Sequence, residues 1–273
     1  MRARPLPAFF LLAFALSWLL WSPLLAAHYG WTGAAPPALH LFGSVGPALA
    51  ALLVTARLGP SARGDLRARL TRWRVGWRPW AFAVGGPLAL LAAGLAVHLI
   101  AGGAWPGWPA LTRVAEYPGL PVAGLILAEL VFYGYGEEVG WRGFALPRLE
   151  ARFGPLWAAV LLALPWALWH LPLLVRNGTY AAMGPALLGG WFLSLLTGSV
   201  LMAWLSHLAR GSLLVLAVFH GLLDIVMVNE GVSTVALSSM GALVTLWGLA
   251  AAWALGHLGR NGRAGRAAQG AQP

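Results

Sequence analysis

Long apolar runs constrain this chain more than any other feature of its sequence. Eight of them follow one another with short interruptions, each close to the roughly 20 residues that a helix needs to cross a bilayer. Because lipid offers no hydrogen-bond partner to an exposed backbone, runs of this length predict helices. They lie at about 7–27, 38–57, 79–101, 120–148, 155–174, 183–208, 212–229 and 234–257.

The composition agrees with a membrane location. Hydrophobic residues make up 59% of the 273 residues and charged residues 10%, whereas soluble domains carry about 25% charged residues. We therefore expect an all-α, polytopic membrane helix bundle of about eight transmembrane helices, with 1–273 forming a single domain. The chain has no cysteine, which excludes disulfides and thiolate sites.

The arginines are distributed unevenly over the loops. With an even number of spans and Arg142 set aside, 15 arginines lie on the side of the two termini and 2 on the other side. Because cytoplasmic loops carry the excess of basic residues, this asymmetry places both termini in the cytoplasm. It predicts a multi-pass plasma-membrane protein with a basic cytoplasmic loop at 58–78 and a flexible cytoplasmic tail at 259–273. The net charge of +10 is then a signal of topology and of contact with lipid, and we expect no nucleic-acid partner.

Two further readings rest on the basic residues. The part of the loop from Arg63 to Arg78, whose only acid is Asp65, could lie on anionic headgroups as a short interfacial helix. We prefer the simpler interpretation, that the positive charge of this loop only sets the topology of the chain. The exclusive use of Arg as the basic residue, with abundant Ala and Gly, indicates GC-rich coding and hence a bacterial source.

One charged stretch interrupts the apolar pattern. It reads Gly136-Glu137-Glu138-Val139-Gly140-Trp141-Arg142-Gly143. Because each charge at a bilayer centre costs roughly 2.5–3.5 kcal/mol, such residues indicate a functional site. Glu138 and Arg142 are four residues apart, which predicts a pair on one helical face. Glu137 points about 100° away and is predicted to face another helix.

Two other polar positions lie within later apolar runs. His170 ends the segment Trp166-Ala167-Leu168-Trp169-His170, and His220 lies four residues before Asp224, on the same helical face. Glu137 precedes Gly154 by 17 residues and His170 follows it by 16. An antiparallel hairpin around Gly154 would therefore bring both to similar depth, predicting one site within the bundle near the cytoplasmic side.

The remaining histidines and the glycines of the charged stretch have simpler interpretations. His40 and His207 lie near predicted span ends without a partner motif, and we interpret them as structural. Gly136, Gly140 and Gly143 predict close helix packing.

The predicted site combines a carboxylate, two imidazoles and a further polar side chain. Such a set suits water activation by a glutamate base, with imidazoles polarising the water or stabilising an oxyanion. Glu137, His170 and His220 could equally hold a zinc ion with an open position for water. The His-Glu-x-x-His pattern is absent, and the sequence does not decide between these alternatives.

The three motifs together resemble a known family. Glu-Glu-x-x-x-Arg, aromatic-x-x-x-His and His-x-x-x-Asp, on successive apolar runs within about 120–230, are similar to the CPBP family (CAAX protease and bacteriocin-processing, or Abi), which includes type II CAAX prenyl endopeptidases. The resemblance implies that Glu137 is the general base and that His170 helps to position water. It implies that His220 and Asp224 stabilise the oxyanion, and that Glu138 and Arg142 support the site.

The chain departs from the family pattern at two positions. Trp166 replaces the usual Phe, and Asp224 stands where eukaryotic members have Asn. Since an ionised Asp cannot donate a hydrogen bond, Asp224 could instead be protonated, ligate a metal or orient His220.

The favoured hypothesis is an intramembrane endopeptidase that cleaves a membrane-associated peptide or protein. One alternative is a non-catalytic bacteriocin-immunity or scaffold protein, which the complete set of Glu137, His170 and His220 disfavours. Another is a proton- or cation-coupled transporter, which the absence of an evident internal repeat disfavours. The sequence leaves the oligomeric state open.

Overall fold

A computed structural model describes residues 4–114, 117, 119–176, 184–228 and 231–270, and within 259–270 only the backbone. Every element in this part of the chain is a helix. The first half contains α1 (Pro5–His28), α2 (Leu39–Ser44), α3 (Gly46–Leu58), α4 (Pro60–Leu70), α5 (Trp77–Ile100), α6 (Trp108–Leu111) and α7 (Val122–Ala128). The second half contains η1 (Glu129–Tyr135), α8 (Gly136–Gly140), η2 (Trp141–Ala145), α9 (Leu146–Phe153), α10 (Pro155–Trp169), α11 (Leu171–Arg176), α13 (Pro185–Leu208), α14 (Leu213–Met227) and α15 (Thr234–Gly270).

The eight predicted apolar runs all correspond to helical stretches. Five stretches are long and apolar enough to cross a membrane, namely Pro5–His28, Leu39–Leu58, Trp77–Ile100, Pro185–Leu208 and Thr234–Leu258. Two shorter apolar helices, Pro155–Trp169 and Leu213–Met227, correspond to two more runs. The remaining run is the stretch from α7 to α9. The all-α polytopic bundle is thereby confirmed, and the protein is a multi-pass membrane protein.

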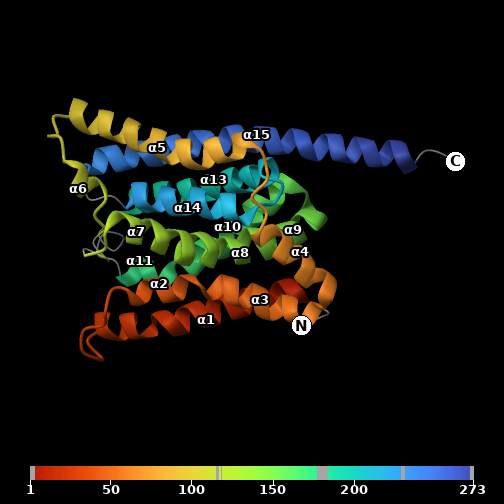
Figure 1. Cartoon of the computed structure of the whole chain (residues 1–273), viewed down its shortest axis with the longest axis horizontal. Coiled ribbons are helices and arrows are strands. Elements are labelled where there is room, and N and C mark those ends of the chain that lie inside the picture. The colour runs from red at the N-terminus through yellow and green to blue at the C-terminus, as the bar shows by residue number, and fades with distance from the viewer. Residues whose placement is uncertain (1–3, 115–116, 118, 177–183, 229–230, 271–273) are drawn as a thin grey trace.

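The helices form three layers (Figure 1). α5 and α15 lie along one face, and α1, α2 and α3 lie along the opposite face. Between them run the helices that carry the charged motifs, including α8, α10 and α14. α14 packs on η1 and α5, while α8 packs on α3. The motif-bearing segments are therefore shielded from both faces.

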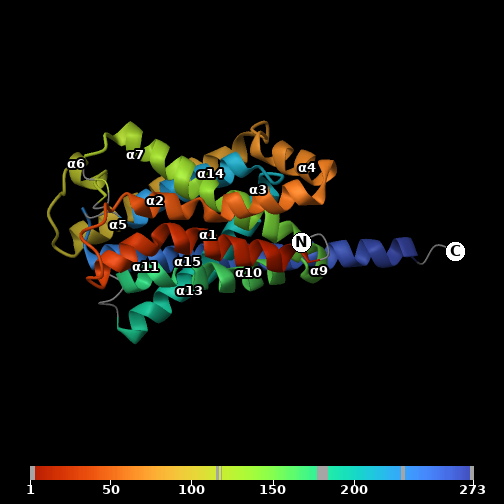
Figure 2. The same cartoon turned by 90° about the horizontal axis from the view of Figure 1, so that it is seen from below.

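Both ends of the chain lie at the same end of the bundle, together with α4 and α9 (Figures 1 and 2). This arrangement fits the even number of spans expected from the sequence. Part of the predicted basic loop at 58–78 is the helix α4. α15 continues as helix to Gly270, into the stretch predicted as a tail, and the flexibility and cytoplasmic location of that stretch stay predictions.

Close packing of the charged stretch depends on two of its glycines. A Cβ at Gly136 would lie 2.8 Å from the carbonyl oxygen of Ser44, and one at Gly140 would lie 2.5 Å from Cβ of Pro47. Contacts this short do not occur between real side chains, so only glycine lets α8 approach α2 and α3. The predicted close packing is confirmed at both positions.

Candidate active site

The two adjacent glutamates lie on α8, a short α-helical segment between two π-helices. η1 precedes Gly136 and η2 begins at Trp141, so the helical hydrogen-bond pattern changes on both sides of the pair. π-helical turns are rare and occur frequently at functional sites. Both glutamates are buried, with Glu137 3% and Glu138 0% exposed. The two buried glutamates therefore lie where the helix departs from regular α-helical geometry.

Glu138 is paired with partners on two helices. Its Oε1 accepts a hydrogen bond from Nη1 of Arg142 at 2.9 Å, which confirms the predicted pair along the helix. The same oxygen lies 2.8 Å from Nδ1 of His220 on α14, which donates to the carboxylate. A buried charge is tolerated when it is paired and hydrogen-bonded. Glu138 thus connects α8 to the helix that carries the third motif.

Glu137 faces α10, as its predicted position on the helix requires. Its Oε2 accepts hydrogen bonds from the indole nitrogens of Trp166 at 2.8 Å and Trp141 at 3.3 Å. Within the described part of the chain, Oε1 of Glu137 takes part in no hydrogen bond, so it can accept one from a water molecule. The side chain is therefore held in place by one oxygen and available for chemistry at the other.

His170 lies at the end of α10, one helical turn beyond Trp166. Its Nδ1 is 2.7 Å from the carbonyl oxygen of Trp166, to which it donates, and Nε2 is left to act as an acceptor. The ring lies against the aromatic rings of Trp166, Trp169 and Trp191, with centroids 5.7, 4.9 and 5.9 Å away. Trp166 therefore links the two predicted catalytic groups: its indole binds Glu137 and its carbonyl binds His170.

Asp224 and Arg142 complete the predicted set. Oδ2 of Asp224 lies 3.5 Å from Nε2 of His220, so the two share a helical face as expected. The guanidinium of Arg142 is buried and lies over the ring of Trp166, 4.4 Å from its centroid. Arg142 thereby contacts both Glu138 and the indole that binds Glu137, which is a supporting position.

The geometry of the site also bears on the possible zinc ion. Among the described residues, no three His, Cys, Asp or Glu side chains gather closely enough to hold a metal ion. Nδ1 of His220 is committed to Glu138, and the link between Glu137 and His170 runs through Trp166. The proposed set of Glu137, His170 and His220 is not assembled as a ligand set here, so we derive no step through a metal.

Sequence reasoning missed two features of this site. It paired Glu138 only with Arg142, because the contact with His220 joins positions 82 residues apart. It assigned no hydrogen bond to Trp141 or Trp166, although their indole nitrogens are the donors to Glu137. The spacing of four residues between Glu137 and Trp141 was an available signal for one of these bonds.

His40 lies nearer to the site than its sequence position suggested. Its Nδ1 is 3.1 Å from the hydroxyl of Tyr133, and its ring packs on Trp21, which in turn packs on Trp169. The ring of Trp169 lies in turn against that of His170, with 4.9 Å between the ring centroids. A histidine interpreted as structural therefore borders the predicted catalytic groups.

Comparison with known proteins agrees with the three motifs. Residues 119–226 match the family model described as Type II CAAX prenyl endopeptidase Rce1-like. CAAX prenyl protease 2 from Methanococcus maripaludis is 32% identical to this chain over 110 residues, which are 39% of this chain and 39% of the relative. The match thus spans less than half of the relative's length. The matched residues contain Glu137, His170, His220 and Asp224, and over this region the chain is similar to the Rce1-like family of type II CAAX prenyl endopeptidases.

Proposed function

We propose that this protein is an intramembrane endopeptidase that hydrolyses a peptide bond in a membrane-associated peptide or protein. The observation that carries the proposal is the buried carboxylate of Glu137, held at Oε2 by two indole donors and unbonded at Oε1 within the described chain. A carboxylate so placed, with Trp166 connecting it to His170, suits a general base for water. The family match and the name of the relative support the same class of reaction.

In the proposed reaction, Glu137 removes a proton from a water molecule whose other hydrogen bond goes to Nε2 of His170. The water oxygen bonds to the scissile carbonyl carbon, and the electron pair of the C=O bond moves to the carbonyl oxygen. Glu137 then delivers its proton to the leaving nitrogen as the C–N bond breaks. The products are a carboxylic acid and an amine, so one water molecule is consumed for each bond cleaved.

In this proposal, His220 stabilises the oxyanion. Its Nδ1 is fixed by Glu138, and its Nε2 lies 3.5 Å from Asp224, too far for a short hydrogen bond. The N–H at Nε2 therefore remains available to the developing negative charge, while the carboxylate of Asp224 lies close enough to orient the ring. This assigns Asp224 an orienting and electrostatic role, and the pair of Glu138 and Arg142 the task of holding His220.

The test is cleavage of a panel of membrane peptides, including a prenylated CAAX peptide, by the full chain in liposomes. Glu137→Gln, His170→Ala and His220→Ala are each expected to lower the rate by about 10²–10⁴, the usual contribution of a general acid–base group. His28→Ala, at an exposed position at the end of α1, is the control and should cleave normally. Cleavage by Glu137→Gln at the wild-type rate would contradict the mechanism.

Two further measurements separate the alternatives. Activity that survives a chelator supports water activation by protein groups alone, whereas activity lost to the chelator and restored by zinc requires a metal. Glu137-dependent charge movement in proteoliposomes, with no cleavage of any peptide, would favour the transporter. A chain that binds a bacteriocin but shows neither peptide cleavage nor charge movement would favour the immunity or scaffold protein.

A further inference from the structure

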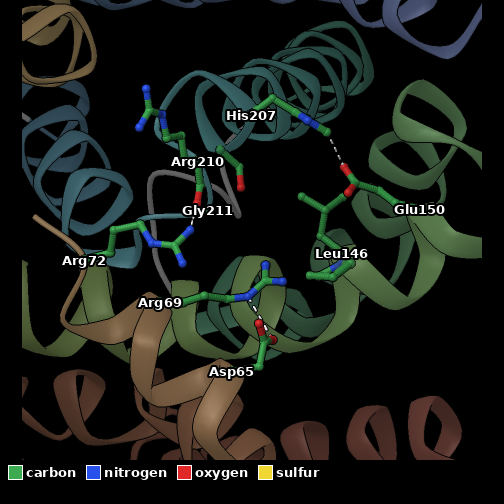
Figure 3. A pocket seen from close by; sticks show the side chains of 10 residues that line it. Asp65, Arg69, Arg72, Leu146, Glu150, His207, Arg210 and Gly211 are labelled. Atoms are coloured by element: carbon green, nitrogen blue, oxygen red, sulfur yellow. Dashed lines mark hydrogen bonds and ion pairs between the residues drawn. The ribbon is translucent and has the colours of Figure 1, made fainter. Parts of the chain in front are cut away.

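A polar cavity lies at the end of the bundle that contains α4 and α9 (Figure 3). It has a volume of about 220 Å³ and lies between α4, α9 and the turn that joins α13 to α14. Three arginines, a histidine and two acids contribute to its lining, namely Arg69, Arg72, Arg210, His207, Asp65 and Glu150. None of the proposed catalytic residues lines it.

The acids of this cavity already have partners. Oδ2 of Asp65 accepts from Nε of Arg69 at 3.0 Å, and Oε1 of Glu150 lies 2.8 Å from Nε2 of His207. These two pairs are drawn as dashed lines in Figure 3. The cavity therefore offers few acceptors that are still open.

Its donors, in contrast, are only partly used. Within the described chain, Arg69 donates from Nε alone, and Arg72 donates from Nη1 to the carbonyl oxygen of Arg210. The terminal nitrogens of Arg69 and the remaining nitrogens of Arg72 are left for a ligand. Three arginines against two carboxylates also leave an excess of positive charge. Unused guanidinium donors with a positive excess suit an anion, and phosphate above all.

The backbone at Arg210 is unusual. With φ of 53°, Arg210 is the one non-glycine residue with positive φ in the described chain, and Gly211 follows at 74°. A left-handed conformation costs an L-residue roughly 1–2 kcal/mol, and Gly or Asn would occupy it at lower cost. Strained residues are often retained where the position serves a function. Here the conformation turns the carbonyl oxygen of Arg210 toward Arg72.

Neighbouring residues place the cavity at the level of lipid headgroups. Trp73 and Trp77 are 58% and 74% exposed, with the guanidinium groups of Arg74 and Arg78 over their rings. Exposed tryptophans are typical of the membrane interface. A second cavity of about 240 Å³ shares Arg210 and is lined by Arg78 and by the apolar side chains of Val75, Trp77, Pro79 and Leu208.

We propose that Arg69 and Arg72 bind the phosphate group of an anionic lipid headgroup, with Arg210 adding positive charge at the edge of the cavity and the adjacent, partly apolar cavity receiving the start of its acyl chains. The bound phosphate would link α4 and the residues that follow it to the turn that joins α13 to α14. Ser212, which caps α14 by accepting from the backbone of Val215 at 3.3 Å, donates to the carbonyl oxygen of Arg72. Anionic lipid therefore stabilises the end of the helix that carries His220.

The experiment measures thermal unfolding of the full chain in neutral detergent with added phosphatidylglycerol, phosphatidylcholine or inorganic phosphate. Phosphatidylglycerol is expected to raise the Tm of the wild type and phosphatidylcholine to leave it unchanged. Arg69→Gln/Arg72→Gln should weaken the apparent binding of phosphatidylglycerol at least about tenfold, because two charge-assisted contacts are lost. The matched control is Arg63→Gln/Arg67→Gln, which removes the same charge from exposed positions of α4 and should bind normally.

Each other outcome counts against the proposal. Equal loss of binding in both double variants would show a diffuse charge effect, and no response of the wild type to phosphatidylglycerol would show no site. Equal stabilisation by inorganic phosphate at the same concentration would identify free phosphate as the ligand instead of a lipid. Should the double variant not fold, Arg210→Gln, at an exposed side chain, makes the same test with the same expected direction.

Discussion

The carboxylate of Glu138 accepts from a guanidinium on its own helix and an imidazole on α14, all three side chains being almost fully buried. Removing one partner of a buried pair leaves a charge unpaired and usually costs more than the pair contributes. Among the described residues, Glu137 has no cationic partner at hydrogen-bond distance and accepts from two neutral indole donors. The two adjacent glutamates therefore differ in kind: one is fixed by charge and the other remains available for reaction.

The indole of Trp166 is predicted to matter through one hydrogen bond. Trp166→Phe keeps an aromatic ring beneath Arg142 but removes the 2.8 Å bond to Glu137. Because a hydrogen bond to a charged group contributes about 1.5–3 kcal/mol, the cleavage rate should fall about tenfold to hundredfold.

Trp169→Phe is the matched control for this variant. Its indole nitrogen is buried and, among the described residues, has no hydrogen-bond partner, so the substitution removes no such bond. The rate should change less than in Trp166→Phe when both are assayed on one peptide. Equal effects of the two substitutions would show that ring size matters and the bond to Glu137 does not.

At the scale of the helices, two features position the charged stretch: the π-helical backbone on both sides of α8, and the close approach of α8 to α3. η1 and η2 flank α8, and α8 lies against α3 at Gly140. Close approach brings the two glutamates into the middle layer of the bundle, where α10 and α14 reach them.

Gly140→Ala is expected to separate α8 from α3. Its Cβ would meet backbone atoms of Pro47 at 2.7 Å, which cannot move aside as a flexible side chain would. Overpacking of this kind costs about 1–3 kcal/mol, to be measured as a fall in stability in detergent.

Gly85→Ala provides the comparison within a helix. Gly85 lies in α5 with nothing within 4 Å of the added Cβ, so the substitution should stabilise the chain by about 0.5–1 kcal/mol. A Gly140→Ala protein as stable as the wild type would mean that the contact with α3 is looser than described.

At the scale of the whole molecule, the two ends of the chain and α4 share one end of the bundle, and α6 lies at the other (Figure 1). The arginine distribution predicts that the end with α4 faces the cytoplasm. The chain has no cysteine, so a single introduced cysteine reports its location without background.

Ser61→Cys on α4 and Ala104→Cys after α5 test the orientation, since both positions are exposed. A membrane-impermeant maleimide should label Ala104→Cys in intact cells, and Ser61→Cys only after permeabilisation. The reverse pattern would invert the predicted orientation. Labelling of both from the same side would contradict the placement of these two positions at opposite ends.

Much of this protein could be predicted from the sequence because the relevant signals are local. The length of the apolar runs determines helices that cross a bilayer, since lipid leaves the backbone no other way to satisfy its hydrogen bonds. The spacing of four residues determines the pair of Glu138 and Arg142 and the common face of His220 and Asp224. These features depend on residues within one helical turn.

Only the tertiary structure decided which helices meet, and so which glutamate binds which partner. The contacts of Glu138 with His220 and of Glu137 with Trp166 join positions 82 and 29 residues apart. Likewise, no pattern in the sequence predicts the two π-helices or the arginine-lined cavity beside the α13–α14 turn. The physical reason is that contacts between helices depend on packing, through close approaches such as that of Gly140 to Pro47, whereas the sequence directly encodes only what each helix presents on its faces.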